Sequence, residues 1–325
     1  MKVLDKTISQ LTIPTPFAVG NTHVYLIKGD LLTLVDAGVK TTEAWEALKT
    51  QLKEIGYSPN DIEQIILTHH HPDHTGLVEE FPRAERLVAH KNVDLWLTRN
   101  ETYFQHYEQF FKEYFIASGI PQHFHRLLDN LRAPLKYAGE GHLTSTIIEG
   151  DSLPGHEDWR VVETKGHAQS HLSFYRETDG SFIGGDHLLR HISPNPLIEP
   201  HPDMDQEGRP KPILQYRANL KKCMSLGIQS VLPGHGDIFS NVEEIIPRHL
   251  HKQEQRAKKV ELLLMDNPQT PFQICMQIFP HQYEKQLDLT MSETIAQLDY
   301  LENEGKVDKT IEDGIFFYHA KKSSK

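Results

Sequence analysis

Four short segments of the chain carry side chains that suit a metal ion. Each is rich in histidine or aspartate, and each follows an apolar run of the kind that forms a β-strand. Imidazole and carboxylate groups bind Zn²⁺, Fe or Mn, and the absence of cysteine from these segments argues against a closed structural zinc site. Loops at one edge of two sheets could bring the segments together. They are residues 68–76, with the sequence THHHPDHTG, and residues 164–167, 184–186 and 232–236.

The spacing of these residues predicts two ions rather than one. His69 and His71 are two residues apart, so both can point the same way from an extended loop. Asp73 and His74 follow a proline bend and can reach a second ion. Asp186 has two carboxylate oxygens and could bridge both ions, which lie about 3.5–4 Å apart in two-metal hydrolytic sites.

This pattern resembles the metallo-β-lactamase superfamily, specifically its glyoxalase II-like hydrolases. The H-x-H-x-D-H motif at 69–74 is followed, in the family's order, by Gly-His at 166–167, Gly-Asp at 185–186 and Gly-His at 234–235. The sequence VDAG at 35–38 also matches, and the resemblance covers about residues 8–250. It implies an α/β fold, an αβ/βα sandwich with the site at one edge. It also implies that one ion is held by His69, His71, His167 and Asp186, and the other by Asp73, His74, Asp186 and His235.

The chemistry expected of such a site is hydrolysis without a protein nucleophile. Two divalent ions, with zinc first and Fe or Mn as alternatives, would lower the pKa of a bridging water towards about 7. The resulting hydroxide would attack a carbonyl or phosphoryl centre, and Asp73 is the candidate catalytic residue that would orient it. The chain has no Gly-x-Ser-x-Gly elbow to supply a serine nucleophile instead. We expect His70, at the variable position of the motif, to be structural.

The elements that must position these residues can be read from apolar periodicity. Residues 1–250 form the expected catalytic domain, which begins with a β-meander over 8–36. Residues 68–76 are expected to be a loop throughout, since they contain a proline and no apolar residue. The pattern predicts helices over 41–55, 213–226 and 241–265, and strands over 62–67, 145–149, 158–164, 171–176, 181–184 and 229–232.

A helical insertion is expected over about residues 91–145. Aromatic residues recur at helical spacing from Tyr103 to Phe115, and 121–131 offers a second helix. The aromatic stripe could roof an apolar substrate pocket, or it could be ordinary core or dimer packing. Residues 190–212 hold six prolines and predict an irregular loop. The candidate substrate contacts are Tyr107, Phe111, His171 and His191.

Residues 251–325 are expected to form a linker helix and a small winged-helix-like domain. Helices are predicted over 271–279 and 291–304, followed by a hairpin around the turn at 312–314. Residues 252–325 carry ten Lys and Arg against twelve Asp and Glu, and the helix at 291–304 has no Lys or Arg. A nucleic-acid reader needs a basic face. We therefore predict a module that packs against the site or dimerises.

The composition of the chain bears on its partners and its localisation. The chain of 325 residues has a formal net charge of −11, which disfavours non-specific binding to nucleic acid. It has two cysteines, no expected signal peptide and no long apolar run, so we expect a cytoplasmic protein without a membrane segment. A small-molecule ester, thioester or lactone is the first expectation for its substrate, and a homodimer is possible. Phosphodiester or RNA hydrolysis and a non-enzymatic metal sensor are the alternatives.

Overall fold

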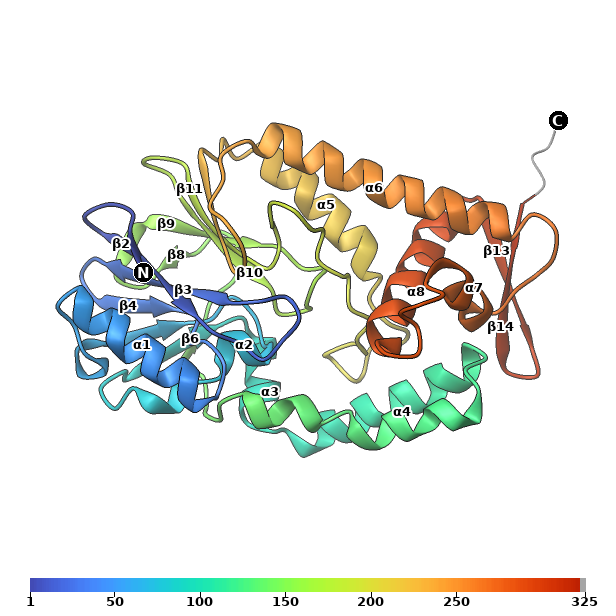
Figure 1. Cartoon of the computed structure of the whole chain (residues 1–325), viewed down its shortest axis with the longest axis horizontal. Coiled ribbons are helices and arrows are strands. Elements are labelled where there is room, and N and C mark those ends of the chain that lie inside the picture. Colours follow the sequence, from blue (N-terminus) through green and yellow to red (C-terminus); the bar gives the residue numbers. More distant parts are fainter. Residues whose placement is uncertain (322–325) are drawn as a thin grey trace.

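Two β-sheets packed face to face form the centre of the protein, as the computed structural model shows for residues 1–321 (Figure 1). The first sheet has the strand order β1-β2-β3-β4-β5-β6-β7 and the second the order β12-β11-β10-β9-β8. Strands β2, β3 and β4 form the predicted antiparallel meander. The first sheet consists of β1 (Lys2–Val3), β2 (Ile8–Ile13), β3 (Thr22–Lys28), β4 (Leu32–Val35), β5 (Gln64–Ile66), β6 (Arg86–Ala89) and β7 (Ser145–Thr146). The second consists of β8 (Ser152–Leu153), β9 (His156–Glu163), β10 (Leu172–Arg176), β11 (Ser181–Gly185) and β12 (Ser230–Pro233).

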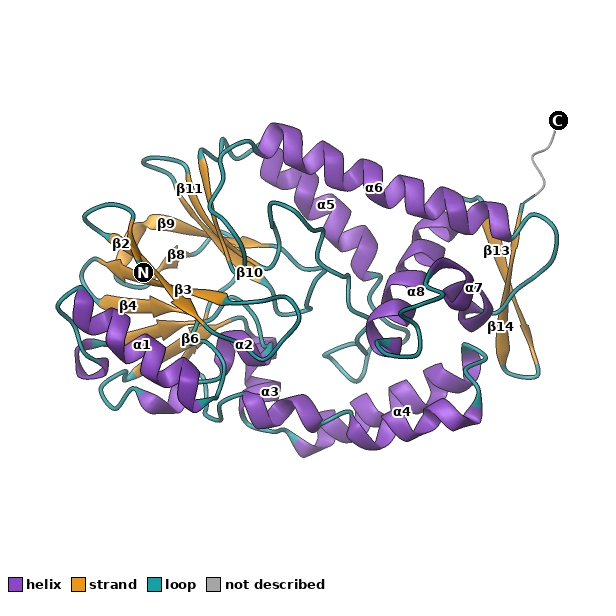
Figure 2. Ribbon diagram, viewed as in Figure 1, coloured by secondary structure: helices purple, strands orange, loops and turns teal. Residues whose placement is uncertain are grey.

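Helices cover the outer face of each sheet, which confirms the expected αβ/βα sandwich (Figure 2). Helix α1 (Thr42–Glu54) begins at Thr41, whose side chain accepts a hydrogen bond from the Ala44 amide. Leu48 and Leu52, one turn apart, are buried against the first sheet, and each contributes about 1.5–3 kcal/mol to folding. Helices α5 (Pro212–Met224) and α6 (Val242–Leu263) cover the second sheet in the same way.

The sequence predicted that the histidine-rich segment is a loop throughout, and this prediction was wrong. Residues Pro72–Thr75 form the single-turn helix α2. Proline has no amide hydrogen to satisfy and is favoured in the first turn of a helix. The carbonyl of His71 accepts hydrogen bonds from the amides of His74 and Thr75, at 3.0 and 3.1 Å. The ring of His74 lies beside that of His69, with their centroids 4.2 Å apart.

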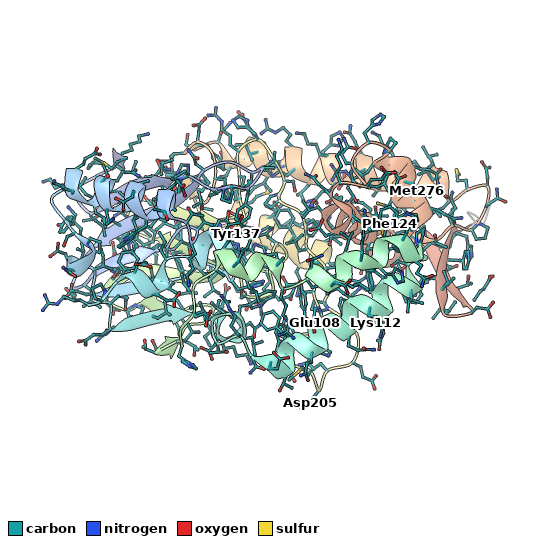
Figure 3. All side chains as sticks on the ribbon, turned by 60° about the horizontal axis from the view of Figure 1, so that its bottom comes forward. Glu108, Lys112, Phe124, Tyr137, Asp205 and Met276 are labelled. Atoms are coloured by element: carbon teal, nitrogen blue, oxygen red, sulfur yellow. The ribbon has the colours of Figure 1, made fainter. Side chains whose placement is uncertain are left out.

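The insertion extends from the edge of the sandwich. After the 3-10 turn Lys91–Val93 come α3 (Asp94–Leu97) and α4 (Glu101–Ala117), on which Glu108 and Lys112 are labelled in Figure 3. The second helix predicted over 121–131 is instead the 3-10 segment Gln122–Asn130, which is followed by a further 3-10 segment, Ala133–Tyr137. Pro134 lies four residues after Asn130 and has no amide hydrogen with which to continue an α-helical ladder. Residues 190–211 contain no helix or strand, as predicted.

The C-terminal elements pack against the insertion. Helix α7 (Pro271–Ile278) and helix α8 (Leu287–Asn303) are followed by the hairpin β13 (Val307–Glu312) and β14 (Ile315–Ala320). The hairpin turn has positive φ angles at Asp313 and Gly314. One apolar cluster joins Phe115 of α4 to Phe272 of α7 and Met291 of α8, so α4 and α8 are held against each other (Figure 1). None of the helices within residues 1–321 has the length and apolar character needed to cross a membrane.

Candidate metal centre

The seven predicted ligands converge at one edge of the sandwich. They lie after strands β5, β9, β11 and β12, with Asp73 and His74 on helix α2 and the others in loops. Three groups of their donor atoms each lie within 4.8 Å of one another. The first group is His69, His71 and His167, the second is Asp73, His74 and His235, and the third is His69, His74 and Asp186.

Three ring nitrogens of the first group point to a common centre. His71 Nδ1 lies 2.9 Å from His69 Nε2 and 3.0 Å from His167 Nε2. The rings of His69 and His71 are nearly perpendicular, with an interplanar angle of 78°. This arrangement brings three nitrogen donors within reach of one metal ion.

Asp186 lies between the first group and a second one. Its Oδ2 is 3.5 Å from His167 Nε2 and also 3.5 Å from His235 Nε2, while its Oδ1 is 3.5 Å from His74 Nε2. Asp73 completes the second group, with its Oδ2 at 3.1 Å from His235 Nε2. One carboxylate therefore faces both groups.

Outer hydrogen bonds decide which ring nitrogen faces the centre. His74 donates from Nδ1 to Asp36 Oδ2 at 2.7 Å, and His235 donates from Nδ1 to the Asn21 carbonyl at 2.8 Å. His167 donates in the same way to the Asn195 carbonyl at 3.0 Å. Each ring is thereby fixed in orientation, with its Nε2 turned towards the centre.

Asp36 holds the two ends of the histidine-rich segment 68–76 in place. Besides accepting from His74, its carboxylate accepts hydrogen bonds from the backbone amide and the hydroxyl of Thr68 at 2.8–3.1 Å. Asp36 has a φ angle of 63°, a conformation that aspartate tolerates better than most residues. The sequence motif at 35–38 was recognised, but this positioning role of Asp36 was not inferred from it.

Two glycines of the motifs are required because another side chain lies too close to leave room for a Cβ atom. A Cβ atom at Gly234 would lie 2.3 Å from Asp186 Oδ1. At Gly166, where φ is 135°, a Cβ would lie 2.5 Å from the Tyr216 side chain. Any larger residue at Gly234 would push into the carboxylate that faces both groups.

The carboxylates of the centre favour protonation of two neighbouring histidines. Burial by itself lowers the pKa of a histidine, but Asp186, Asp36 and Asp73 together raise the pKa of His74 well above its usual value. Burial is likewise outweighed at His235, where Asp186 and Asp73 raise the pKa to about 10. Burial raises the pKa of Asp186, yet the two histidines hold it well below its usual range. A divalent cation would displace these protons.

The donor set fits divalent metal ions. His74 Nε2, His235 Nε2 and Asp186 Oδ1 are buried atoms without a hydrogen-bond partner within the described residues. Such orphaned atoms are costly unless a ligand satisfies them. Mixed imidazole and carboxylate donors without thiolate suit Zn²⁺, Fe or Mn.

His171 and His191, two predicted substrate contacts, occupy other roles. His171 is fully buried: its Nε2 accepts a hydrogen bond from the Asp186 amide at 3.0 Å, and its Nδ1 lies 2.8 Å from Thr164 Oγ1. Both nitrogens are therefore in use, so His171 positions the Asp186 loop and cannot contact a substrate. His191 is exposed and is not among the residues that line the cavity described next.

An apolar cavity of about 380 Å³ opens beside the first group, against His71 and Pro72. Tyr107 and Phe111, the other two candidate contacts, line this cavity. Its walls come from α4, from 197–199 and from the start of α8. The C-terminal helix thus forms part of the wall.

Glu199 is a functional candidate that sequence reasoning missed. It is buried in the cavity wall, and its Oε1 has no hydrogen-bond partner among the described residues. His70 Nε2 lies 3.7 Å away, while His70 Nδ1 is 2.8 Å from Ser170 Oγ and its ring stacks on Trp96. Burial raises the pKa of Glu199 to about 8 and lowers that of His70 to about 3, so the pair is neutral near pH 7. Glu199 belongs to the proline-rich loop, where no periodicity marks a site.

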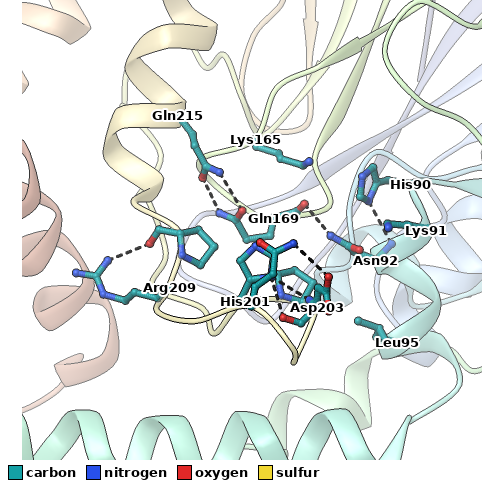
Figure 4. Close-up of a pocket in the computed structure, with 13 residues that line it drawn as sticks. His90, Lys91, Asn92, Leu95, Lys165, Gln169, His201, Asp203, Arg209 and Gln215 are labelled. Atoms are coloured by element: carbon teal, nitrogen blue, oxygen red, sulfur yellow. Dashed lines mark hydrogen bonds between the residues drawn. The ribbon is translucent and has the colours of Figure 1, made fainter.

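A second pocket of about 640 Å³ is polar and contains none of the seven predicted ligands (Figure 4). Gln169 and Gln215 join two of its walls through a hydrogen bond of 2.8 Å. Of its cationic groups, Lys165 pairs with Glu163 and Arg209 pairs with Asp299. The apolar cavity, and not this pocket, is lined by one of the seven candidate ligands, His71.

Comparisons with known proteins agree with this architecture. The family model of the metallo-beta-lactamase superfamily matches residues 18–235. A probable metallo-hydrolase, YqjP of Bacillus subtilis (strain 168), is 39% identical over 294 residues, which cover 90% of this chain and 92% of the relative. The atrochrysone carboxyl ACP thioesterase of Aspergillus fumigatus is 24% identical over 78% of this chain and 62% of its own length.

Solved structures resemble the whole chain, including the C-terminal elements. A metallo-beta-lactamase family protein from Thermus thermophilus has a TM-score of 0.81 at 25% identity, covering 98% of this chain and 100% of that one. A beta-lactamase domain protein from Burkholderia ambifaria has a TM-score of 0.76 at 21% identity and covers 98% and 94%. The chain therefore belongs to the metallo-beta-lactamase superfamily and is a hydrolase of that family.

Proposed function

We propose that this protein is a dinuclear metal-dependent hydrolase that cleaves an ester, thioester or lactone. The observation that carries the proposal is the pair of donor groups that share Asp186 and open into an apolar cavity. The first ion would be held by His69, His71, His167 and Asp186, and the second by Asp73, His74, Asp186 and His235. We propose zinc as the native metal, with Fe or Mn as alternatives.

The ions, when bound, would supply an activated water and would polarise the scissile carbonyl. Asp73 would orient that water: burial raises its pKa, but His74 and His235 lower it below its usual value, so the side chain is ionised. An ionised carboxylate can accept a hydrogen bond from the water and afterwards pass a proton to the leaving group. The buried walls of the cavity would keep bulk water from the reacting atoms.

Similarity to a thioesterase supports an acyl substrate. The atrochrysone carboxyl ACP thioesterase and a second fungal relative, the thioesterase pkgB of Emericella nidulans, are named for thioester hydrolysis. The ligand set also supports placing this chain near the glyoxalase II-like hydrolases of the superfamily.

The structure gives little support to a nuclease. We propose that residues 251–325 form a winged-helix-like unit, because α6, α7, α8 and the hairpin follow one another in that order. In such a unit α8 would face the nucleic acid. Here α8 is buried along most of its length, and its Glu293 and Asp299 pair with Arg256 and Arg209. We propose that the unit walls the substrate cavity instead.

The test is turnover by the metal-loaded protein on four substrates: p-nitrophenyl acetate, S-lactoylglutathione, an acyl-homoserine lactone and bis-p-nitrophenyl phosphate. We expect hydrolysis of at least one carboxylic substrate in preference to the phosphodiester. Preference for the phosphodiester would favour the nuclease alternative, and no turnover at full metal occupancy would favour a sensor. Asp73→Ala should abolish turnover, and full activity at normal metal loading would contradict the role of Asp73.

A further inference from the structure

The apolar cavity has an inner end, a mouth and a defined chemical character. At the inner end, His71 and Pro72 belong to the metal-binding segment. At the mouth lie Leu127, on a 3-10 segment of the insertion, and Leu289, near the start of α8, with exposed fractions of 37% and 36%. The cavity therefore connects the candidate reaction centre with solvent.

Aromatic and aliphatic side chains form the body of the cavity. Trp96, Tyr107 and Phe111 contact one another edge-on or at a tilt, with ring centroids 5.4 Å apart between Trp96 and Tyr107 and 4.8 Å between Tyr107 and Phe111. Leu197 and Met291 face the same space from the proline-rich loop and from α8. An apolar group that enters this space gains the free energy of leaving water.

The charges of the cavity disfavour an anionic ligand. Its lining contains the carboxyl groups of Glu199, Glu284 and Asp288. Within residues 1–321, Lys285 at the mouth is the one lysine or arginine that lines it. Apart from the metal ion proposed at the inner end, a carboxylate or phosphate inside the cavity would meet carboxyl groups and, among the lysine and arginine side chains of residues 1–321, Lys285 alone.

From this geometry we propose that the cavity binds the apolar acyl group of the substrate, and that the insertion and α8 together set the acyl length. The proposal rests on the hydrolase function proposed above. A volume of about 380 Å³ has room for on the order of a dozen water-sized groups of about 30 Å³. It can enclose an acyl chain of medium length, whereas a large polar leaving group must remain outside.

The test is hydrolysis of p-nitrophenyl acetate, butyrate, octanoate, laurate and palmitate by the full-length, metal-loaded protein. We expect kcat/KM to rise about fourfold for each methylene that the cavity buries, and to stop rising once the cavity is full. Equal rates on acetate and octanoate would overturn the assignment of the cavity while leaving the hydrolase function intact. Absence of hydrolysis of every ester would overturn the hydrolase function and this inference with it.

A parallel series of alkyl acetates distinguishes the acyl group from the leaving group. If kcat/KM rises with the length of the alcohol instead of the acid, the cavity binds the leaving group and the proposal is wrong. If it changes little along this series, the acyl assignment is supported.

Variants at the mouth test the role of the walls. Leu289→Trp should narrow the cavity and lower the octanoate-to-acetate ratio of kcat/KM at least tenfold, and Leu127→Trp should act in the same direction. Leu262→Trp is the matched control, because Leu262 is 52% exposed on α6 and does not line the cavity. An unchanged ratio in both mouth variants, with normal metal content, would overturn the proposal.

Discussion

The metal centre and the apolar cavity meet at His71 but are built on different principles. The centre consists of buried donors whose orientation is fixed by outer hydrogen bonds, such as those between His74 and Asp36 and between the Asp186 amide and His171. The cavity consists of side chains from the insertion, the proline-rich loop and the C-terminal unit, held by apolar contact. We therefore expect that the metal centre determines the reaction, that the cavity determines which substrate is hydrolysed, and that each can be changed without the other. Changes in the centre should alter metal content, and changes in the cavity should not.

Asp186→Asn should have the largest effect. It removes the carboxylate that faces both donor groups, so metal content and turnover should fall together, turnover on the order of 1000-fold. Elemental analysis and ester hydrolysis measure both quantities. Asp237→Asn is the control, because that side chain is 78% exposed. A variant with two bound ions and normal turnover would contradict the shared role of Asp186.

His171→Gln should have a smaller effect, confined to the centre. The loss of its hydrogen bond to the Asp186 amide should weaken metal affinity about 10–100-fold, as is typical for partners that orient metal ligands. Competition with a chromogenic chelator measures the affinity. His191→Gln is the control on an exposed residue. Unchanged affinity in His171→Gln would show that the Asp186 loop holds its position without it.

Phe111→Ala should change the cavity and leave the metal centre unchanged. It removes apolar surface from the cavity, so kcat/KM for an octanoate ester should fall on the order of tenfold while metal content stays the same. Ile116→Ala, at an exposed position on α4, is the matched control. Loss of metal from Phe111→Ala would mean that the cavity and the centre are not independent.

Glu199→Gln should have the smallest effect, visible as a change in pH dependence. Burial raises the pKa of Glu199 from 4.5 to about 8, so between these values the unfolded chain releases a proton that the folded metal-free protein keeps. The free energy of unfolding should therefore fall by up to about 1.4 kcal/mol per pH unit over this range because of Glu199. Below pH 4.5 the effect should vanish.

Chemical denaturation of chelator-treated protein between pH 5 and 8 measures this slope. The slope should be smaller in Glu199→Gln than in the wild type, and unchanged in Glu284→Gln at the exposed mouth. Identical slopes in all three proteins would show that Glu199 is ionised in the folded state.

The sequence was most informative where residues close together in the chain serve the same function. The candidate ligands His69, His71, Asp73 and His74 could be named because their types and spacing are local, and the strands before each loop were visible as apolar runs. The fold class followed from the same pattern. The turn that makes α2 was missed because a proline was taken to end regular structure, although it can begin a helix.

The rest depends on contacts between distant segments. Trp96, Leu197 and Leu289 line one cavity although they are far apart in the chain, and no motif connects them. His171 was assigned to the substrate because sequence does not show whether a side chain at the start of a strand faces the cavity or the core. Glu199 is buried only because the proline-rich loop folds back against Trp96 and His70, which no local periodicity indicates.

We propose that two metal ions share Asp186 and that both are needed for hydrolysis. The most direct test is titration of the metal-free protein with Zn²⁺ while bound metal and ester hydrolysis are measured in the same samples. Activity should reach its maximum at two bound ions per chain, and Asp186→Asn should reach neither two bound ions nor that activity. Full activity at one bound ion, or in the absence of metal, would contradict it.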